Sequence, residues 1–141
     1  MKAKSLYFTK TGHSKRIARY LEKELGIEAL DCKKRPLVEG LDLLFVIGGI
    51  YGGKSDPKFL EYLDRLDSTA AKKAVLMTSC TSNRSPQQQV RQTLEAKGIF
   101  VAEEEFICKG SFLIFAKGHP NQEDLENAAA FAKAQLNQQI D

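Results

Sequence analysis

Long apolar runs are absent from this sequence of 141 residues. No run approaches the roughly 20 residues that a helix needs to cross a bilayer, so we expect no membrane span. Residues 1–4 lead directly into an apolar strand pattern without the apolar stretch of a signal peptide, which predicts a cytoplasmic protein. Low-complexity tracts are also missing, and 43% hydrophobic with 28% charged residues is typical of a folded, soluble chain. The length suits a single domain over residues 1–141.

Closely spaced cysteines and concentrated charge are missing too. Cys32, Cys80 and Cys108 are widely separated and odd in number, so we expect free thiols and no metal site. Lys and Arg exceed Asp and Glu by only 21 − 18 = 3. The densest basic and acidic runs, residues 33–35 and 103–105, are short and suit solvated surface. A nucleic-acid partner is not expected, because such proteins usually gather their positive charge.

The spacing of the apolar residues predicts alternating strands and helices. Residues 4–8 are mostly apolar, and residues 42–48 contain the continuous apolar run 43–47, as parallel strands buried on both faces should. In residues 15–25 apolar side chains recur every three or four positions, which predicts an amphipathic helix that Gly26 ends. Further strands are expected at 27–31, 73–79 and 99–102, the last interrupted by three glutamates and resuming at 106–108. Further helices are expected to begin at Pro57, at Pro86 with Ser85 as N-cap and an end at Lys97, and near Asn121 with a capping partner at Asp124. Residues 32–41 are expected to form a loop or a single turn, and the apolar piece at 112–115 is assigned to no element.

Strands that alternate with helices predict right-handed crossovers and an α/β fold, a five-stranded parallel sheet with helices on both faces. In open sheets of this kind, ligands bind outside the carboxyl ends of the strands, where the strand order reverses. The loops after the first, third and fourth expected strands hold the Gly, Ser, Thr and Tyr residues of interest. These three loops are therefore the candidate site.

The loop after the first strand has the composition of a phosphate site. Its hydroxyls can donate hydrogen bonds from several directions, Gly12 allows close approach of the backbone, and the next helix offers N–H groups without intrahelical partners. The loop contains no acidic residue. The alternative for so short a motif is an ordinary strand-to-helix turn capped by Ser14. The candidate phosphate-binding residues are Thr9, Lys10, Thr11, Gly12, His13 and Ser14.

The motif Thr-x-Thr-Gly-x-Ser in residues 9–14 resembles the FMN-phosphate loop of flavodoxins, whose pattern is Thr/Ser-x-Thr-Gly-x-Thr/Ser. It is not a P-loop, because the Gly-Lys-Ser/Thr ending is missing, and it is not the Gly-x-Gly-x-x-Gly dinucleotide fingerprint. The resemblance covers essentially the whole chain. It implies a flavodoxin-like, doubly wound sheet with strand order 2-1-3-4-5 and FMN as the cofactor.

The same resemblance implies that the loops after the third and fourth strands enclose the isoalloxazine ring. Tyr51 is the only aromatic residue in these loops and is the candidate for ring stacking; the alternative is a half-buried tyrosine that packs on its own loop. Gly52 or Gly53 can reorient a peptide near flavin N5 without a Cβ penalty. Cys80 either modulates the ring environment, is an oxidisable thiol, or is an inert buried cysteine. The candidate ring-binding residues are Gly49, Ile50, Tyr51, Gly52, Gly53, Ser79, Cys80 and Thr81.

The resemblance implies an FMN-binding electron-transfer protein that works with redox partner proteins, and we expect a monomer. Two alternatives stay open: a small FMN-dependent oxidoreductase of the quinone or porphyrinogen type, and a flavodoxin-like interaction module without flavin. The sequence has no pair of a His and a carboxylate near these loops that could act as a general acid or base, so no catalytic residue is assigned. An electron carrier is therefore expected rather than an enzyme that converts a substrate. The chain departs from electron-carrier flavodoxins in having no tryptophan and a net charge of +3, where such carriers are usually strongly acidic.

Overall fold

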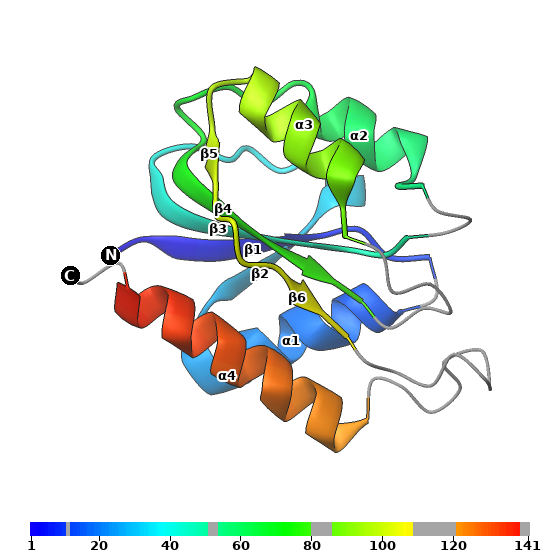
Figure 1. Cartoon of the computed structure of the whole chain (residues 1–141), viewed down its shortest axis with the longest axis vertical. Coiled ribbons are helices and arrows are strands. Elements are labelled where there is room, and N and C mark those ends of the chain that lie inside the picture. Colours follow the sequence, from blue (N-terminus) through cyan, green and yellow to red (C-terminus); the bar gives the residue numbers. More distant parts are fainter. Residues whose placement is uncertain (11, 51–53, 80–85, 109–120, 139–141) are drawn as a thin grey trace.

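The computed structural model describes residues 1–10, 12–50, 54–79, 86–108 and 121–138. Its strands are β1 (Ala3–Tyr7), β2 (Glu28–Asp31), β3 (Leu41–Gly48), β4 (Ala71–Thr78), β5 (Phe100–Val101) and β6 (Phe106–Ile107); its helices are α1 (His13–Leu25), α2 (Pro57–Leu63), α3 (Gln88–Ala96) and α4 (Gln122–Gln138), with a 3-10 turn, η1 (Cys32–Lys34). A parallel sheet forms the middle layer, with α1 and α4 on one face and α2 and α3 on the other (Figure 1). The predicted α/β class is confirmed.

The sheet is organised around β1 and β3, which lie side by side at its centre. The strand order is β2-β1-β3-β4-β5, which confirms the predicted order 2-1-3-4-5. In β1, Leu6 pairs in parallel with Leu30 of β2 and with Val46 of β3. β3 pairs in parallel with β4 as far as Gly48 and Thr78. The chain thus runs outward from β1 to β2 and then crosses back to β3, so the strand order reverses between β1 and β3.

The fifth strand is split, as its three glutamates predicted. β5 and β6 are separate short strands, and both pair in parallel with β4. Across the interruption, the Arg91 guanidinium of α3 donates to the Ala102 carbonyl at 2.7 Å and lies 3.4 Å from a carboxylate oxygen of Glu105. A side chain from the covering helix therefore satisfies a carbonyl at the point where the strand leaves the sheet.

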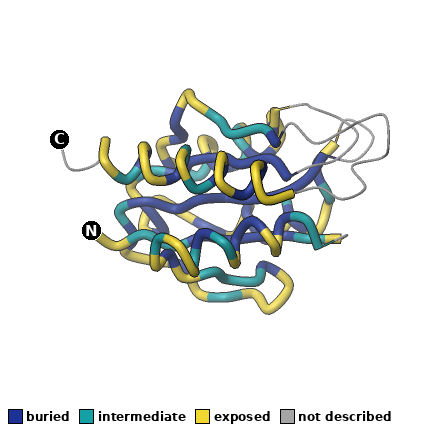
Figure 2. The backbone as a smooth tube through the Cα atoms, turned by 90° about the horizontal axis from the view of Figure 1, so that it is seen from below, coloured by how far each residue is buried: buried dark blue, intermediate teal, exposed yellow. Residues whose placement is uncertain are grey.

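Alternate side chains of the central strands enter two separate cores. In β3, Leu44 and Val46 pack on the face covered by α2 and α3, whereas Leu43, Phe45 and Ile47 pack on the face covered by α1 and α4. Successive side chains of a strand point to opposite faces, so one strand serves both cores. Figure 2 shows this burial as dark blue along the strands and on the inner sides of the helices. Burial on both faces explains the continuous apolar run that predicted this strand.

The start of α3 differs from the prediction. Pro86 was expected at the first helical position, but the helix begins at Gln88, while Ser85, the expected N-cap, lies outside the described residues. The buried side chain of Gln87 donates to the Met77 carbonyl of β4 at 2.9 Å. This contact holds the residue before the helix against the sheet, with a non-helical backbone. The prediction was wrong because a tertiary contact, invisible in the local pattern, delays the helix.

Other element ends agree with the sequence. Pro57 opens α2 with Asp56 as N-cap, and Gly26 ends α1 in a left-handed conformation with φ 71°. The single turn expected within residues 32–41 is η1. Residues 112–115 lie outside the part of the chain that the structure describes.

The start of α4 has the predicted capping arrangement. The Asp124 N–H donates to Asn121 Oδ1 at 2.8 Å, and the Asn121 N–H donates to Asp124 Oδ2 at 2.9 Å. Reciprocal bonds of this kind satisfy N–H groups for which a helix start has no intrahelical acceptor.

Replacing Asn121 by Ala should lower the free energy of unfolding by about 0.5–2 kcal/mol, because the acceptor for the Asp124 N–H is lost. Urea denaturation measures the change. Asn127→Ala, at an exposed position of the same helix, is the matched control and should leave stability unchanged or slightly higher. An Asn121→Ala protein as stable as the parent would contradict the capping role.

Candidate functional site

The three candidate segments begin at one edge of the sheet. In Figure 1 the arrows of β4 and β6 point toward this edge. Backbone hydrogen bonds continue the ladder just past the strand ends, from Phe8 N to Ile47 O at 3.0 Å, from Ser79 N to Gly48 O at 2.8 Å, and from Cys108 N to Thr78 O at 3.0 Å. Because the strands are parallel and in register, the chain leaves β1, β3 and β4 at the same side of the molecule.

The loop after β1 closes through the side chain of Thr9. The Gly12 N–H donates to Thr9 Oγ1 at 2.7 Å, which leaves the hydroxyl proton of Thr9 free to be donated elsewhere. Gly12 has a left-handed backbone, φ 91°, which residues with a Cβ atom rarely adopt. Its carbonyl accepts a hydrogen bond from the Arg16 N–H at 3.0 Å. Gly12 is therefore the N-cap of α1, and the turn itself requires glycine there.

The first turn of α1 has the character of an anion site. His13 begins the helix, no described side chain caps it, and its first turn contains no acidic residue. Ser14 is not the cap that the alternative interpretation requires, because it lies inside the helix. Its side chain is buried, and Ser14 Oγ has no hydrogen-bond partner among the described residues. An unsatisfied buried hydroxyl costs about 1–3 kcal/mol, so this position suits an acceptor that is not part of the described chain.

Lys10 connects the loop after β1 with the start of α2. Lys10 Nζ lies 3.0 Å from Asp56 Oδ2, and the same carboxylate accepts from the Lys58 N–H at 2.8 Å as the N-cap of α2. Burial alone would raise the pKa of Asp56, but the hydrogen bonds from Lys10 and the Lys58 N–H hold this pKa below its ordinary value. Part of the positive charge that Lys10 brings to the loop is therefore balanced by Asp56.

At the end of β3 the backbone passes close to two side chains. A Cβ atom on Gly48 would lie 2.7 Å from Phe59 Cε2 and 3.0 Å from Gln87 Oε1, so a larger residue could not fit without a shift. Gly49 and Ile50, which begin the predicted ring-binding segment, are buried. Close packing against α2 and the start of α3 therefore fixes where this segment leaves the sheet.

Further buried hydroxyls near this edge have no hydrogen-bond partner within the described ranges. They belong to Thr78 and Ser79 at the end of β4 and to Ser55 before α2. Ser79 is a predicted site residue, whereas the sequence reasoning missed Thr78 and Ser55. A threonine that directly follows the apolar run of residues 74–77, at the end of the strand, is the signal that could have identified Thr78. Such unsatisfied groups are uncommon in folded proteins and call for an explanation, of which a bound polar ligand is one.

Eight of the predicted site residues are described, and their positions are given above. The other predicted residues lie outside the described residues, namely Thr11, Tyr51, Gly52, Gly53, Cys80 and Thr81.

The expectation of three free thiols is wrong for Cys108, which is disulfide-bonded. Cys32 is a free, buried thiol, and burial raises its pKa to about 12. The pairing of Thr78 with Ile107 and the bond from Cys108 N to Thr78 O place Cys108 beside the end of β4. Distance along the chain does not reveal that neighbourhood.

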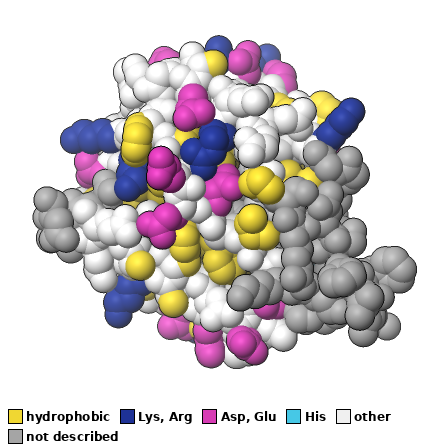
Figure 3. Space-filling view, viewed as in Figure 1, with side chains coloured by type: hydrophobic (Ala, Val, Ile, Leu, Met, Phe, Trp, Pro, Cys, Tyr) yellow, Lys and Arg dark blue, Asp and Glu magenta, His cyan; other side chains and the backbone are white. Residues whose placement is uncertain are grey.

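Over the ranges that the structure describes, no group of three or more His, Cys, Asp or Glu side chains could hold a metal ion. Nor is any helix in these ranges long and apolar enough to cross a membrane. On the face shown in Figure 3, Lys and Arg side chains are interspersed with Asp and Glu.

Comparisons with known proteins agree with this geometry. The flavodoxin domain pattern matches residues 6–111. An uncharacterized protein of Methanocaldococcus jannaschii is 32% identical over 151 residues, which cover 96% of this chain and 99% of that protein. Among solved structures, oxidised Flavodoxin 2 from Bacillus cereus has a similar fold, with a TM-score of 0.67 at 16% identity over 98% of this chain and 99% of that one. A short-chain flavodoxin associated with a non-canonical PDU bacterial microcompartment is also similar, with a TM-score of 0.62 at 15% identity over 99% of both chains.

Asp56→Asn should remove the ion pair with Lys10 but keep the helix cap, because Asn caps helices about as well as Asp. The pKa of Asp56 is lowered in the folded protein, so its charge stabilises the fold above the ordinary carboxyl pKa of 3.8, and this contribution is lost as the pH falls through the folded pKa. We expect the free energy of unfolding to fall by about 0.5–1 kcal/mol near neutral pH, because half-exposed ion pairs contribute little more. Urea denaturation as a function of pH should show this difference narrowing toward about pH 3. A difference of the same size at both ends of the range would contradict the role of the charge.

Proposed function

Because this chain belongs to the flavodoxin family, we propose that it binds FMN and exchanges electrons with redox partner proteins. When bound, FMN supplies the redox chemistry, since it can take up or release one or two electrons. The chain binds the phosphate, positions the ring and limits the access of water. We further propose that the protein acts in the cytoplasm as a monomer.

The observation that carries this proposal is the buried, unpartnered hydroxyl of Ser14 in the first turn of α1. A phosphate accepts hydrogen bonds from hydroxyls and from the N–H groups at a helix start, and it is attracted by the positive end of the helix dipole. The Thr9 hydroxyl can add a donor, because it uses only its oxygen to accept the Gly12 N–H. The residues present therefore fit a phosphate monoester better than an uncharged group.

The two halves of the proposed site have different tasks. The loop after β1 would hold the phosphate, and the segments after β3 and β4 would lie against the ring, with Tyr51 as the stacking residue. The buried hydroxyls of Thr78 and Ser79 are additional candidates to hydrogen-bond polar atoms of FMN. The proposed phosphate residues are Thr9, Lys10, Thr11, Gly12, His13 and Ser14, and the proposed ring residues are Gly49, Ile50, Tyr51, Gly52, Gly53, Ser79, Cys80 and Thr81.

Ser14→Ala should weaken FMN binding by about 1–3 kcal/mol, because one charge-assisted hydrogen bond to the phosphate is lost. Riboflavin, which lacks the phosphate, should bind the variant and the parent equally. Titration of flavin-free protein, followed by quenching of flavin fluorescence, measures both affinities. Ser14→Ala should not destabilise the flavin-free fold, since the deleted hydroxyl has no partner among the described residues.

Ser5→Ala is the matched control for this experiment. Ser5 also has a buried, unpartnered hydroxyl, but it lies within β1 and away from the carboxyl edge. FMN affinity should be unchanged in this variant. Equal FMN affinities for the parent, Ser5→Ala and Ser14→Ala proteins would reject Ser14 as a phosphate ligand.

A further inference from the structure

A cavity of about 420 Å³ lies between the start of the β2-to-β3 connection and α2. Its described lining comes from Phe8 at the end of β1, from η1 and Arg35, and from α2. The connection from β2 to β3 contains only the three-residue turn η1, so no full crossover helix covers this part of the sheet. A volume of this size is within the roughly 300–1,000 Å³ typical of sites for small molecules.

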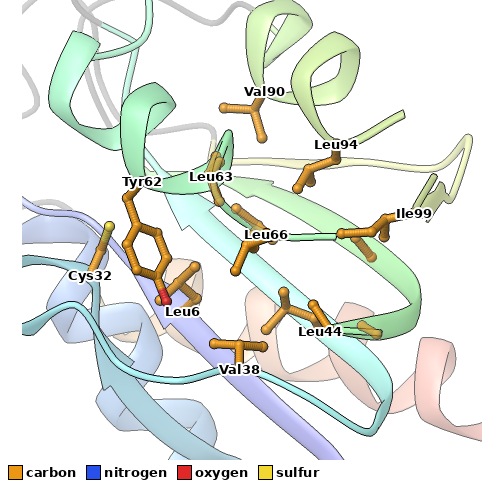
Figure 4. Close-up of a cluster of buried hydrophobic side chains, with 14 of the residues drawn as sticks. Leu6, Cys32, Val38, Leu44, Tyr62, Leu63, Leu66, Val90, Leu94 and Ile99 are labelled. Carbon is orange, nitrogen blue, oxygen red and sulfur yellow. The ribbon is translucent and has the colours of Figure 1, made fainter. Parts of the chain in front are cut away.

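The floor of the cavity is apolar and held in place. The Phe8 ring stacks on Phe59, with 5.4 Å between centroids, and the Tyr62 hydroxyl donates to the Pro36 carbonyl. Figure 4 shows the thiol of Cys32 next to the Tyr62 ring. With a pKa raised to about 12 by burial, this thiol is uncharged at neutral pH. The Phe8 and Tyr62 rings and the uncharged Cys32 thiol give this part of the cavity an apolar lining, which suits a flat, apolar ligand group.

The rim of the cavity is positively charged. The Lys33 amine lies 5.3 Å from the centroid of the Phe8 ring, and the Arg35 guanidinium lies 5.6 Å from that of Tyr62. Lys58 lines the same cavity. Glu61 is the only acidic residue in the described lining, and its carboxylate is already engaged, 3.3 Å from Arg35 and 2.7 Å from Arg65. The rim therefore attracts an anion.

Arg35 adopts an unusual backbone conformation at this rim. It is the only residue other than glycine with positive φ, at 51°, among those that the structure describes. Its N–H donates to the Cys32 carbonyl at 2.9 Å, which closes η1, and its guanidinium lies over the Tyr62 ring. A non-glycine residue in this region is uncommon and is often associated with a functional site.

We propose that this cavity binds a small aromatic carboxylate, whose ring replaces the Lys33 and Arg35 side chains over the Phe8 and Tyr62 rings and whose carboxylate lies between Lys33 and Lys58. Among the described residues of the proposed phosphate loop, 9, 10 and 12–14, none lines the cavity. The proposal does not depend on FMN binding. It combines two features of the described lining, an apolar pocket and cations that lie over its aromatic rings.

Titration with trans-cinnamate, followed by the amide signals of ¹⁵N-labelled protein, tests the proposal. The neutral isostere cinnamamide is the ligand control, and excess FMN in every sample keeps the phosphate loop occupied if it binds FMN. We expect saturable shifts at η1, Arg35 and the first turns of α2, and weaker binding of cinnamamide by at least about 10-fold. Lys33→Gln and Lys58→Gln should each weaken cinnamate binding by about 3–10-fold.

Lys23→Gln, on the exposed side of α1, is the matched control and should bind cinnamate as the parent does. The absence of saturable shifts into the millimolar range would overturn the proposal. So would shifts confined to the first turn of α1, or equal affinities for cinnamate and cinnamamide. Because the shifts are mapped residue by residue, a failure here is distinct from a failure of FMN binding.

Discussion

Parallel pairing of β1 with β3 is the constraint on which the rest of this structure depends. It places the reversal of strand order at the centre of the sheet, and it aligns the carboxyl ends of β1, β3 and β4 along one edge. The backbone bonds from Phe8 to Ile47 and from Ser79 to Gly48 extend that alignment to the first residues of the loops. The candidate site residues lie far apart in the sequence, and they come together only because the parallel strands β1, β3 and β4 pair in register.

Buried hydroxyls without hydrogen-bond partners among the described residues are the feature of this architecture on which the proposed function rests. Interiors usually pair their hydroxyls, yet Ser14, Thr78 and Ser79 carry buried hydroxyls without partners near the same edge. The first turn of α1 adds a helix start with no described side-chain cap. The ion pair of Lys10 with Asp56 connects the loop after β1 with the start of α2. The loop, which leads into α1 on one face of the sheet, is thereby held to a helix on the opposite face. The proposal of an anionic ligand at this edge rests on these features together.

Much of the fold could be predicted because local pattern and burial agree. The apolar run of β3 reflects burial on both faces, and the capping pair of Asn121 and Asp124 acts within four residues. The sequence could not predict the contact of Gln87 with β4, which delays α3, or the pairing of β4 with β6 near Cys108. Nor could it predict the cavity beside Tyr62, since residues from three distant segments form it. In each case the missing information is a contact between segments far apart in sequence.

The most direct test of the central claim compares the affinities of the unmodified protein for FMN and for riboflavin. The two ligands share the isoalloxazine ring and differ in the phosphate, so the ratio isolates what the loop after β1 contributes. If hydroxyls and helix N–H groups receive the phosphate, FMN should bind tighter by at least about 10–100-fold. Equal dissociation constants would contradict a phosphate site at this edge, however tightly the ring itself is bound.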